Sequence, residues 1–508
     1  MRRRLAGVIA LFGLMCAAAE DYRSASPFPV EDKAQLFVDR VLVRDTDNVA
    51  FTLHPARKHP ANPIVKADRP WEGWRLEIYG NVIRDEDEGI FKMWYLGEEN
   101  EAFPHYAVYY ATSVDGVHWD KPPVGTVQTP KYEKHNVIAG DIILPSVIKD
   151  KNDPNPARRY KMIGWDQKRH AYHTWTSPDG LNWSPLSREP LCRSGDVITG
   201  YYDEQRKLYV AFPKIGYSVR GHDRRVFWLI TSADFETWTE PELVITPDLR
   251  DDASSLARLE EVRPILDVPD DPALMRTEFY GVGAYPAESC TIAFLWMLTI
   301  NNNARYGNQE GPGELQLAVS RDLRNWERPF RTPCVPRGKL DEWDRGFFVT
   351  QSRALRVGDE IWLYYGGSTY THGTPCLYRA ENTGRHTEQT GSIGLAIWPL
   401  DRFVSADAPP EGGALTTIPV VFTGDRLELN AAVKEGGSIV VQLADAAGKP
   451  LEGYHASESI HGDSLRHVVR WNAAINVSPL AGTPVSIRFN MRSAELYSFA
   501  FREGNAPS

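Results

Sequence analysis

Short apolar runs alternate with turn-forming residues along almost the whole chain. Examples lie at residues 106–112, 227–231 and 361–365, and all three are rich in aromatic and β-branched side chains. Runs of this kind predict β-strands, whereas the periodicity of long amphipathic helices is hard to find. The pattern therefore predicts an all-β fold.

A Ser-x-Asp-x-x-x-Trp motif follows several of these runs. It stands at residues 113–119, 177–183, 232–238 and 320–326, and Pro399, Asp401 and Phe403 mark a degenerate fifth copy. The Ser and Asp side chains of such a turn bond back to nearby backbone N–H groups, and we expect the Trp to pack between neighbouring sheets. The motif is thus interpreted as a scaffold turn that joins the last two strands of a four-stranded unit.

An acidic residue stands just before, or on, the first strand of each unit. The units cover about residues 71–122, 135–187, 192–242, 275–329 and 341–406. Their acids are Glu77, Asp141, Asp196, Glu278 and Asp344. First strands line the central channel of a β-propeller, so these acids are expected to converge. The repeat therefore predicts a five-bladed β-propeller over residues 20–405, with a funnel of carboxylates on its axis.

The residues on either side of the repeat have other patterns. Within residues 27–70, the segment 36–39 is the best candidate for an outer strand that closes the ring. Residues 406–413 are rich in Pro and Gly and are interpreted as a linker. From Ile418 onward short alternating runs separated by turns predict a small C-terminal β-sandwich over residues 415–508.

The first residues are typical of an export signal. A basic start at Arg2 to Arg4, an apolar run and the small residues Ala17 to Ala19 predict a signal peptide over residues 1–19. The protein is therefore expected to be secreted or periplasmic. Cys192, Cys290, Cys334 and Cys376 would then meet an oxidising compartment, and their wide spacing predicts one disulfide or none.

The composition narrows the classes of partner. A net charge of −10 argues against nucleic acid or an anionic membrane as partner. Later segments are too polar to insert into a membrane. Phosphate-binding glycine loops, Cys-x-x-Cys pairs and His-Glu-x-x-His are absent from the sequence, so we expect no cofactor and no catalytic metal. A structural Ca²⁺ ion is compatible with the sequence, which leaves the oligomeric state open.

These turns and acids resemble the five-bladed propeller superfamily that contains invertases, arabinanases and mannoside phosphorylases. The closing run at residues 391–396, followed by Asp401 and Phe403, also resembles the last blade of secreted members. The resemblance covers about residues 35–405. It implies a glycoside hydrolase that acts on a poly- or oligosaccharide through three funnel carboxylates.

The chemistry of glycoside cleavage explains why carboxylates are needed. One carboxylic acid protonates the leaving oxygen, and a carboxylate acts on the opposite face of the sugar ring. The chain offers five candidate acids without an unambiguous trio, and Glu278, beside Tyr280, is the first choice for the general acid. Expected substrate-binding residues are His372, Arg345, Tyr280 and Trp343. Arginines that could bind a carboxylated or sulfated sugar are Arg224, Arg225, Arg263 and Arg345.

Two other functions fit the same sequence. An acid at the start of a strand also serves a purely structural role when it accepts backbone N–H bonds. The alternatives are therefore a non-catalytic carbohydrate-binding propeller, or a different lytic activity on the same scaffold.

Overall fold

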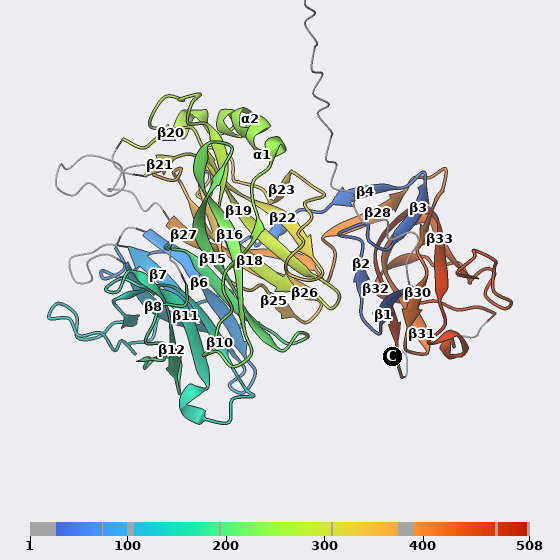
Figure 1. The fold of residues 1–508 in the computed structure, drawn as a ribbon, viewed down its shortest axis with the longest axis horizontal. Helices are drawn as coiled ribbons and strands as arrows, with labels where there is room; N and C mark the ends of the chain where they lie inside the picture. The colour runs from blue at the N-terminus through green and yellow to red at the C-terminus, as the bar shows by residue number, and fades with distance from the viewer. Residues whose placement is uncertain are drawn as a thin grey trace, which may run out of the picture.

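The computed structural model describes residues 27–73, 75–98, 106–192, 195–305, 308–373, 391–472 and 476–504. Within them strands predominate, and the helices α1 (Leu249–Ala253) and α2 (Ser255–Glu260) are short. Single 3-10 turns lie at Pro156–Arg158, Arg263–Ile265 and Ser478–Leu480. The prediction of an all-β fold is confirmed. Figure 1 shows a larger and a smaller body side by side, both built from sheets.

The larger body consists of antiparallel sets of strands that follow one another along the chain, and its first and last sets are joined into one nine-stranded sheet by a short parallel contact. The first set is β6 (Arg75–Asp85), β7 (Ile90–Glu98), β8 (Tyr106–Ser113) and β9 (Val137–Ala139). The second is β10 (Ile142–Lys149), β11 (Tyr160–Asp166), β12 (Ala171–Ser177) and β13 (Ser184–Pro185). The third is β14 (Ile198–Asp203), β15 (Leu208–Val219), β16 (His222–Ser232) and β17 (Glu242–Ile245). The fourth is β18 (Arg276–Pro286), β19 (Thr291–Ile300), β22 (Gly313–Ser320) and β23 (Pro333–Val335).

The fifth set takes its outer strand from the N-terminal part of the chain. Its first strand is split into β24 (Phe348–Thr350) and β25 (Leu355–Val357), both of which pair with β26 (Glu360–Ser368). The next strand is β27 (Gly391–Pro399), and β5 (Arg57–Lys58) pairs with its far side. Residues from the two ends of the larger body therefore meet in one set. A short hairpin of β20 (Asn302–Asn303) and β21 (Gln309–Glu310) extends from the fourth set.

The first strands of the sets form a closed circle. β6 contacts β10, β10 contacts β14, β14 contacts β18, β18 contacts β24, and β24 contacts β6. We call these five strands the inner ring. Their side chains are largely buried, and β18 is buried along nearly its whole length. The inner ring therefore brings the starts of distant strands together.

The turn motif is present as side-chain to backbone hydrogen bonds. In the first copy, Ser113 Oγ accepts the Gly116 N–H at 2.8 Å, while Asp115 Oδ1 accepts the Val117 and His118 N–H groups at 2.9 and 2.8 Å. The corresponding aspartates of the other copies accept the same pair of backbone bonds, and they are Asp179, Asp234 and Asp322. The motif residues are scaffold, as predicted.

Each turn also contacts the preceding set around the inner ring. The Gly116 carbonyl accepts a bond from the Tyr364 hydroxyl of the fifth set, and the Gly180 carbonyl accepts one from Trp94 Nε1 of the first set, both at 2.8 Å. The other turns make contacts through aromatic side chains. Lys161 lies over the Phe235 ring, Trp326 packs against Phe212, and Phe403 packs against Phe294. The turns therefore link every set to its neighbour.

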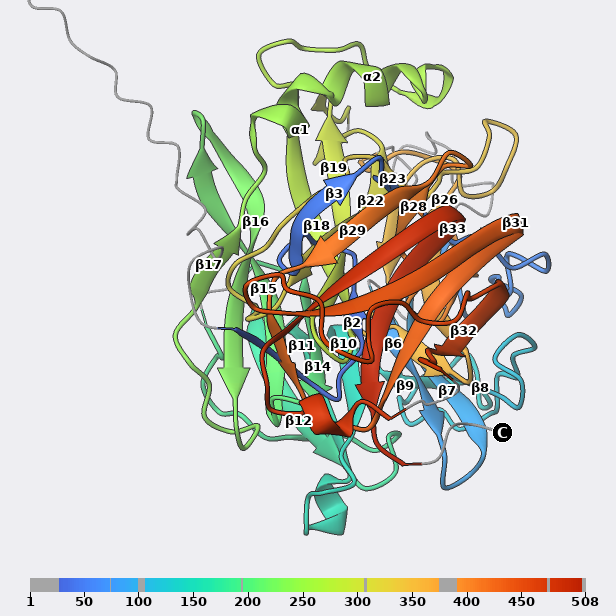
Figure 2. The same cartoon turned by 90° about the vertical axis from the view of Figure 1, so that its right-hand side faces the viewer.

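The smaller body is a ten-stranded sheet that combines both ends of the chain. Its N-terminal strands are β1 (Phe28–Glu31), β2 (Gln35–Leu36), β3 (Val43–Asp47) and β4 (Ala50–Leu53). Its later strands are β28 (Val404–Ala408), β29 (Gly413–Thr417), β30 (Val420–Phe422), β31 (Arg426–Asp445), β32 (Gly462–Val468) and β33 (Val485–Arg502). The long strands β31 and β33 cross the front of this body in Figure 2. They enclose a separate apolar core that includes Phe422, Phe489 and Phe501.

Two expectations about the chain's outer segments were wrong. Leu36 does not close the ring, because β2 pairs with β33 at Ser498 and Phe499, and β5 supplies the closing strand instead. Ala406 and Ala408 do not lie in a linker, because β28 pairs with both β4 and β33. These pairings join segments that are distant in the sequence, which local patterns cannot reveal.

Three cysteines lie among the described residues. Cys192, Cys290 and Cys334 are free thiols, and burial raises the pKa of Cys290 and Cys334 to about 12. Cys376 and the expected signal peptide lie outside the described residues. In the described part of the chain no helix has the length and apolar character needed to cross a membrane.

Candidate functional site

Three of the five predicted acids gather around Tyr280 on β18. Glu77 lies near the start of β6, Asp196 lies two residues ahead of β14, and Glu278 lies near the start of β18. Burial raises the pKa of the Tyr280 hydroxyl, and the charge of Asp196 and then that of Glu77 raise it further. The cations that pair with Asp196 and Glu278, namely Lys214 and Arg225, lie 4.3 and 5.5 Å from the centroid of the Tyr280 ring. We call this group of residues, with their charged partners, the Tyr280 cluster.

Asp196 is the solvent-accessible acid of the cluster. Its side chain is 51% exposed and forms an ion pair with Lys214 of β15. Partial burial acts to raise the pKa of Asp196, but the positive charges of Lys214 and Arg225 outweigh it, so the pKa is lowered. The Lys214 Nζ atom also lies 4.3 Å from the centroid of the Tyr280 ring. Asp196 is therefore an ionised carboxylate that faces solvent at neutral pH.

Glu278 is enclosed and held by two arginines. It is 1% exposed, accepts a 2.8 Å bond from Arg276 Nε, and forms an ion pair with Arg225 of β16. The second Arg225 amino group donates to Asn308 Oδ1 and Gln309 Oε1 at 2.8 Å each. Arg225 thus ties β16, β18 and the β20–β21 hairpin together. Two guanidinium groups therefore fix the Glu278 carboxylate in place.

Glu77 is the acid that the first set contributes to the cluster, near the start of β6. It is 6% exposed and forms an ion pair with Arg75, two residues earlier on β6. Burial, and then the neighbouring Tyr280 hydroxyl, strongly raise the pKa of Tyr79, which lies next along this face of the strand. The two tyrosines are therefore protonated at neutral pH and supply hydroxyl groups beside Glu77.

His372 belongs to the same cluster. The centroid of its ring lies 4.9 Å from the centroid of the Tyr280 ring and 5.3 Å from that of the Phe347 ring. Nδ1 is 2.6 Å from the Gln309 carbonyl oxygen, which can only accept, so Nδ1 carries the hydrogen and Nε2 is an acceptor. Burial and then the charge of Arg225 lower the pKa of His372 to about 3. His372 is thus neutral at physiological pH.

Asp141 and Asp344 lie apart from the cluster. Asp141 is 53% exposed and pairs with Lys168 of the β11–β12 turn at 2.6 Å. Asp344 lies four residues ahead of β24, in a turn, and is 1% exposed. It accepts bonds from Lys58 Nζ at 2.6 Å and from the Tyr365 hydroxyl at 2.8 Å. A position ahead of a first strand therefore does not by itself direct a side chain to the axis.

Trp343 and Arg345 flank Asp344 and share its surroundings. Trp343 stacks on Tyr365, with centroids 5.6 Å apart and an interplanar angle of 28°. Arg345 donates bonds of 2.8 Å to the carbonyls of Thr369 and Leu340. Both side chains therefore support the loops of the fifth set, where the sequence predicted substrate contacts.

The sequence analysis did not predict Lys214 as a residue of the site. It interrupts the apolar run of β15, and a charged residue within such a run is a recognisable signal of a buried partner. The described residues contain no group of three or more His, Cys, Asp or Glu side chains placed to hold a metal ion.

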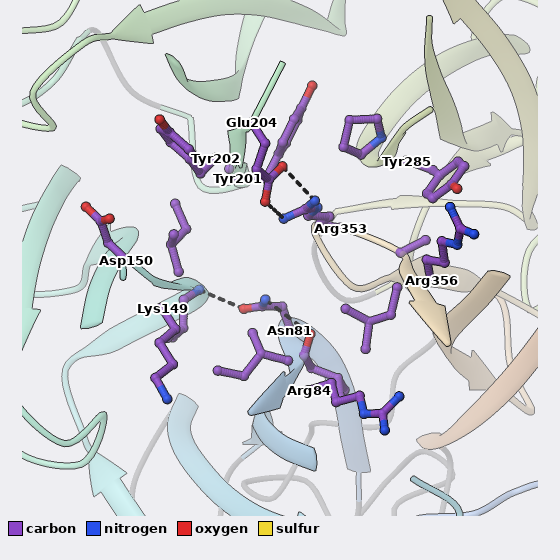
Figure 3. Close-up of a pocket in the computed structure, with 18 of the residues that line it drawn as sticks. Asn81, Arg84, Lys149, Asp150, Tyr201, Tyr202, Glu204, Tyr285, Arg353 and Arg356 are labelled. Atoms are coloured by element: carbon purple, nitrogen blue, oxygen red, sulfur yellow. Dashed lines mark hydrogen bonds and ion pairs between the residues drawn. The ribbon is translucent and has the colours of Figure 1, made fainter. Parts of the chain in front are cut away.

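A cavity of about 590 Å³ opens at the other ends of the inner strands. It is lined by the last residues of β6, β10, β14 and β18 and by the segment between β24 and β25. Figure 3 shows Asn81, Glu204 and Arg353 around its centre. Since the Tyr280 cluster lies at the starts of the same strands, the inner ring carries polar groups at both of its ends.

Comparison with known proteins gives distant matches. No family model matches the chain. An uncharacterized protein of Mycobacterium tuberculosis (strain CDC 1551 / Oshkosh) is 29% identical over 163 residues, which cover 28% of this chain and 49% of that protein. The chain therefore spans about half the length of the curated relative that it matches.

Solved structures that match include enzymes that act on carbohydrates. A β-1,2-mannobiose phosphorylase from Listeria innocua is 12% identical, with 68% of this chain and 97% of that chain covered and a TM-score of 0.41. A putative glycoside hydrolase from Bacteroides ovatus is 13% identical, with 69% and 97% covered and a TM-score of 0.38. An N-acetylgalactosamine deacetylase from F. plautii is 15% identical, with 74% and 96% covered and a TM-score of 0.38. Overlaps at these TM-scores assign neither a fold nor a reaction to this chain.

Proposed function

We propose that this chain is a five-bladed β-propeller that hydrolyses glycosidic bonds with the carboxylates of the Tyr280 cluster. The closed inner ring and the turns that link each set to the preceding one support five blades. The β1–β4 strands and residues 404–502 would then form one accessory β-sandwich rather than a purely C-terminal domain. The export signal expected over residues 1–19 would place the enzyme outside the cytoplasm.

One observation carries the catalytic part of the proposal. Acids from three different sets, namely Glu77, Asp196 and Glu278, lie with their charged partners around one tyrosine. A structural acid needs only a local partner, whereas glycoside cleavage needs carboxylates on two faces of one sugar ring. Convergence of this kind is what a catalytic funnel requires.

The surroundings of the three acids divide their roles. Asp196, ionised and half exposed, would act as the base or nucleophile. Glu278, locked by Arg225 and Arg276, would orient the arginine network rather than donate a proton. Glu77, which forms an ion pair with Arg75, is the remaining carboxyl of the cluster and would protonate the leaving oxygen. Tyr280 and His372 would contact the sugar, by ring stacking and by acceptance of a hydroxyl hydrogen at Nε2.

Non-catalytic carbohydrate binding is the second candidate function. It is favoured by the ion pairing of all three acids, because fully paired carboxylates can serve as hydrogen-bond acceptors for sugar hydroxyls without chemistry. A binding protein would keep its affinity for a glycan but release no sugar.

Release of reducing ends from a panel of polysaccharides tests the proposal. We expect Asp196→Asn and Glu77→Gln to lower turnover by a factor on the order of 10²–10⁴ while the circular dichroism spectrum stays unchanged. The matched control is Asp141→Asn, which removes an exposed lysine-paired carboxylate outside the cluster and should leave turnover intact. If the panel yields glycan binding without release by the parent protein, the binding function replaces the hydrolase.

A further inference from the structure

We propose that the cavity at the far ends of the inner strands is a second binding site, which takes a saccharide bearing a carboxylate and holds that carboxylate on Arg353. The site is separate from the Tyr280 cluster, which lies at the opposite ends of the same strands. It does not depend on the proposed hydrolysis.

An ion pair between Glu204 and Arg353 crosses this cavity. The two Glu204 oxygens accept bonds from the two Arg353 amino groups at 3.0 and 2.8 Å, as the dashed lines in Figure 3 show. Glu204 follows β14 and Arg353 follows β24, and β18 lies between these strands in the inner ring. The pair therefore joins sets that are not neighbours, across the line of the cavity.

The ion pair is exposed to solvent, so a ligand carboxylate can replace that of Glu204 on Arg353. The side chains of Glu204 and Arg353 are 58% and 33% exposed. An exposed ion pair contributes little to folding stability, because water and salt screen both charges. The planar fork of Arg353 binds any carboxylate in the same two-bond manner. A ligand carboxylate can thus take the place of Glu204 at no large cost to the fold.

Further arginines favour a negative ligand. Arg84 and Arg356 line the same cavity, and in Figure 3 both lie on one side of it. Arg84 lies over the Phe91 ring and Arg356 donates to the Gly358 carbonyl at 3.2 Å. Among the residues described neither arginine forms an ion pair with a carboxylate, although the charge of Arg356 helps to lower the pKa of Glu288 in the same lining. In contrast, Lys149 of the lining is paired with Asp85 and Asp87.

The rest of the lining suits the hydroxyl groups of a sugar. Asn81 is 4% exposed, and its Oδ1 accepts the Val147 N–H at 2.7 Å, while its Nδ2 makes one long contact of 3.5 Å with the Val82 carbonyl. One amide hydrogen therefore remains for a ligand. Tyr202 and Tyr285 add aromatic surface to the lining, and a cavity of about 590 Å³ is of the size that holds a small saccharide.

Isothermal titration of the full chain with digalacturonic acid tests the proposal. We expect Arg353→Gln to weaken binding by roughly tenfold or more, since a charged two-bond contact is lost. Glu204→Gln should tighten binding by about threefold, because the competing internal carboxylate is removed. The two variants break the same ion pair, so a purely structural effect would move both affinities in the same direction.

Three control titrations complete the test. Neutral galactobiose and inorganic sulfate should each bind at least about tenfold more weakly than digalacturonic acid if both the carboxylate and the sugar are recognised. The Asp196→Asn variant should bind digalacturonic acid as the parent does, which would distinguish this site from the Tyr280 cluster. Three results would overturn the proposal. The first is that neither the parent nor Glu204→Gln binds digalacturonic acid, and the second is that galactobiose or sulfate binds as tightly as digalacturonic acid. The third is that Glu204→Gln loses the binding that the parent shows.

Discussion

The Tyr364 hydroxyl, on β26, donates a 2.8 Å hydrogen bond to the carbonyl oxygen of Gly116 in the turn after β8. Tyr364 is completely buried, and the Trp119 ring of the same turn packs edge-on against it. This contact joins the last set of the larger body to the first. The closure of the ring thus relies on a side chain and a turn that lie 248 residues apart.

Gly116→Ala should disrupt the contact that joins the fifth set to the first. Gly116 has a φ of 76°, and a Cβ atom there would lie 2.6 Å from the Trp362 ring and 2.7 Å from the Tyr364 oxygen. The left-handed backbone costs about 1 kcal/mol for alanine, and the crowding adds about 1–3 kcal/mol. We expect a loss of about 2–4 kcal/mol in the free energy of unfolding, measured by urea denaturation.

Gly89→Ala is the matched control for that substitution. Gly89 has a φ of 71°, but its Cβ would meet nothing within 4 Å. This variant should lose only about 1 kcal/mol, the cost of the backbone conformation. Equal losses in the two variants would mean that the contact between the turn and the fifth set is unimportant.

Lys214→Met should change the pH dependence of turnover. Lys214 and Arg225 lower the pKa of Asp196 below its ordinary value of 3.8, so activity that needs the ionised carboxylate should persist until the pH falls below that value. Without the Lys214 charge the carboxyl regains its proton at a higher pH. We expect the acid limb of the kcat profile to move to higher pH in the variant.

The control for this shift is Lys168→Met. Lys168 pairs with Asp141 at 2.6 Å on the surface, so its loss removes a comparable lysine–aspartate pair outside the cluster. The acid limb should remain where it is in the parent. A shift of the same size in both variants would point to a general effect of net charge and not to Asp196.

Asp344→Asn should destabilise the fold without a direct effect on turnover. Asp344 is 1% exposed, whereas its partner Lys58 retains 27% of its side-chain surface. Removal of one partner leaves the Lys58 charge without its anion, at a cost of about 2–3 kcal/mol, less than for a fully buried pair. Thermal unfolding would measure this loss, and kcat per folded molecule should be unchanged.

The double variant Asp344→Leu with Lys58→Met checks the explanation. Replacement of both partners by apolar groups removes the orphaned charge, so much of the lost stability should return. If turnover instead falls by orders of magnitude in Asp344→Asn, with stability preserved, Asp344 would regain a catalytic role.

The repeated turns and first strands could be predicted from the sequence. The partners of single side chains could not. The Asp115 turn and its copies are local, so four residues in order specify their hydrogen bonds. The position of Glu77 and Glu278 follows from equivalent places on two first strands. Asp344 differs because its partner Lys58 comes from a strand 286 residues earlier, which no local pattern indicates.

Stability between about pH 4 and pH 7 should depend on Asp401. This residue stands two residues after Pro399, the end of β27, as Asp115 stands two residues after Ser113, and its φ is 60°. It is 8% exposed at the junction of the two bodies, among Glu288, Arg356, Arg466 and Arg502. Burial, and then the charge of Glu288, raise the pKa of Asp401 to about 7, although the three arginines oppose the shift.

The sign of the effect follows from proton binding. Between its unfolded value of 3.8 and about 7, the folded state holds a proton on Asp401 that the unfolded state has released. The free energy of unfolding should therefore fall as the pH rises through this window, by on the order of 4 kcal/mol, and level off above it. Asp401→Asn cannot ionise, and asparagine tolerates the positive φ. The variant should match the parent near pH 4 and exceed it in stability near pH 8.

Urea denaturation of parent and variant at pH 4 to 8 measures this difference directly. The ion pairs that link the two bodies, such as Glu288 with Arg502, are present in both proteins, so their titration cancels in the comparison. Asp341→Asn, a change at an exposed aspartate, should give a curve parallel to that of the parent. A gap between Asp401→Asn and the parent that stays constant with pH would show that Asp401 is ionised in the folded protein. In that case the junction of the two bodies would hold one more carboxylate charge among its arginines.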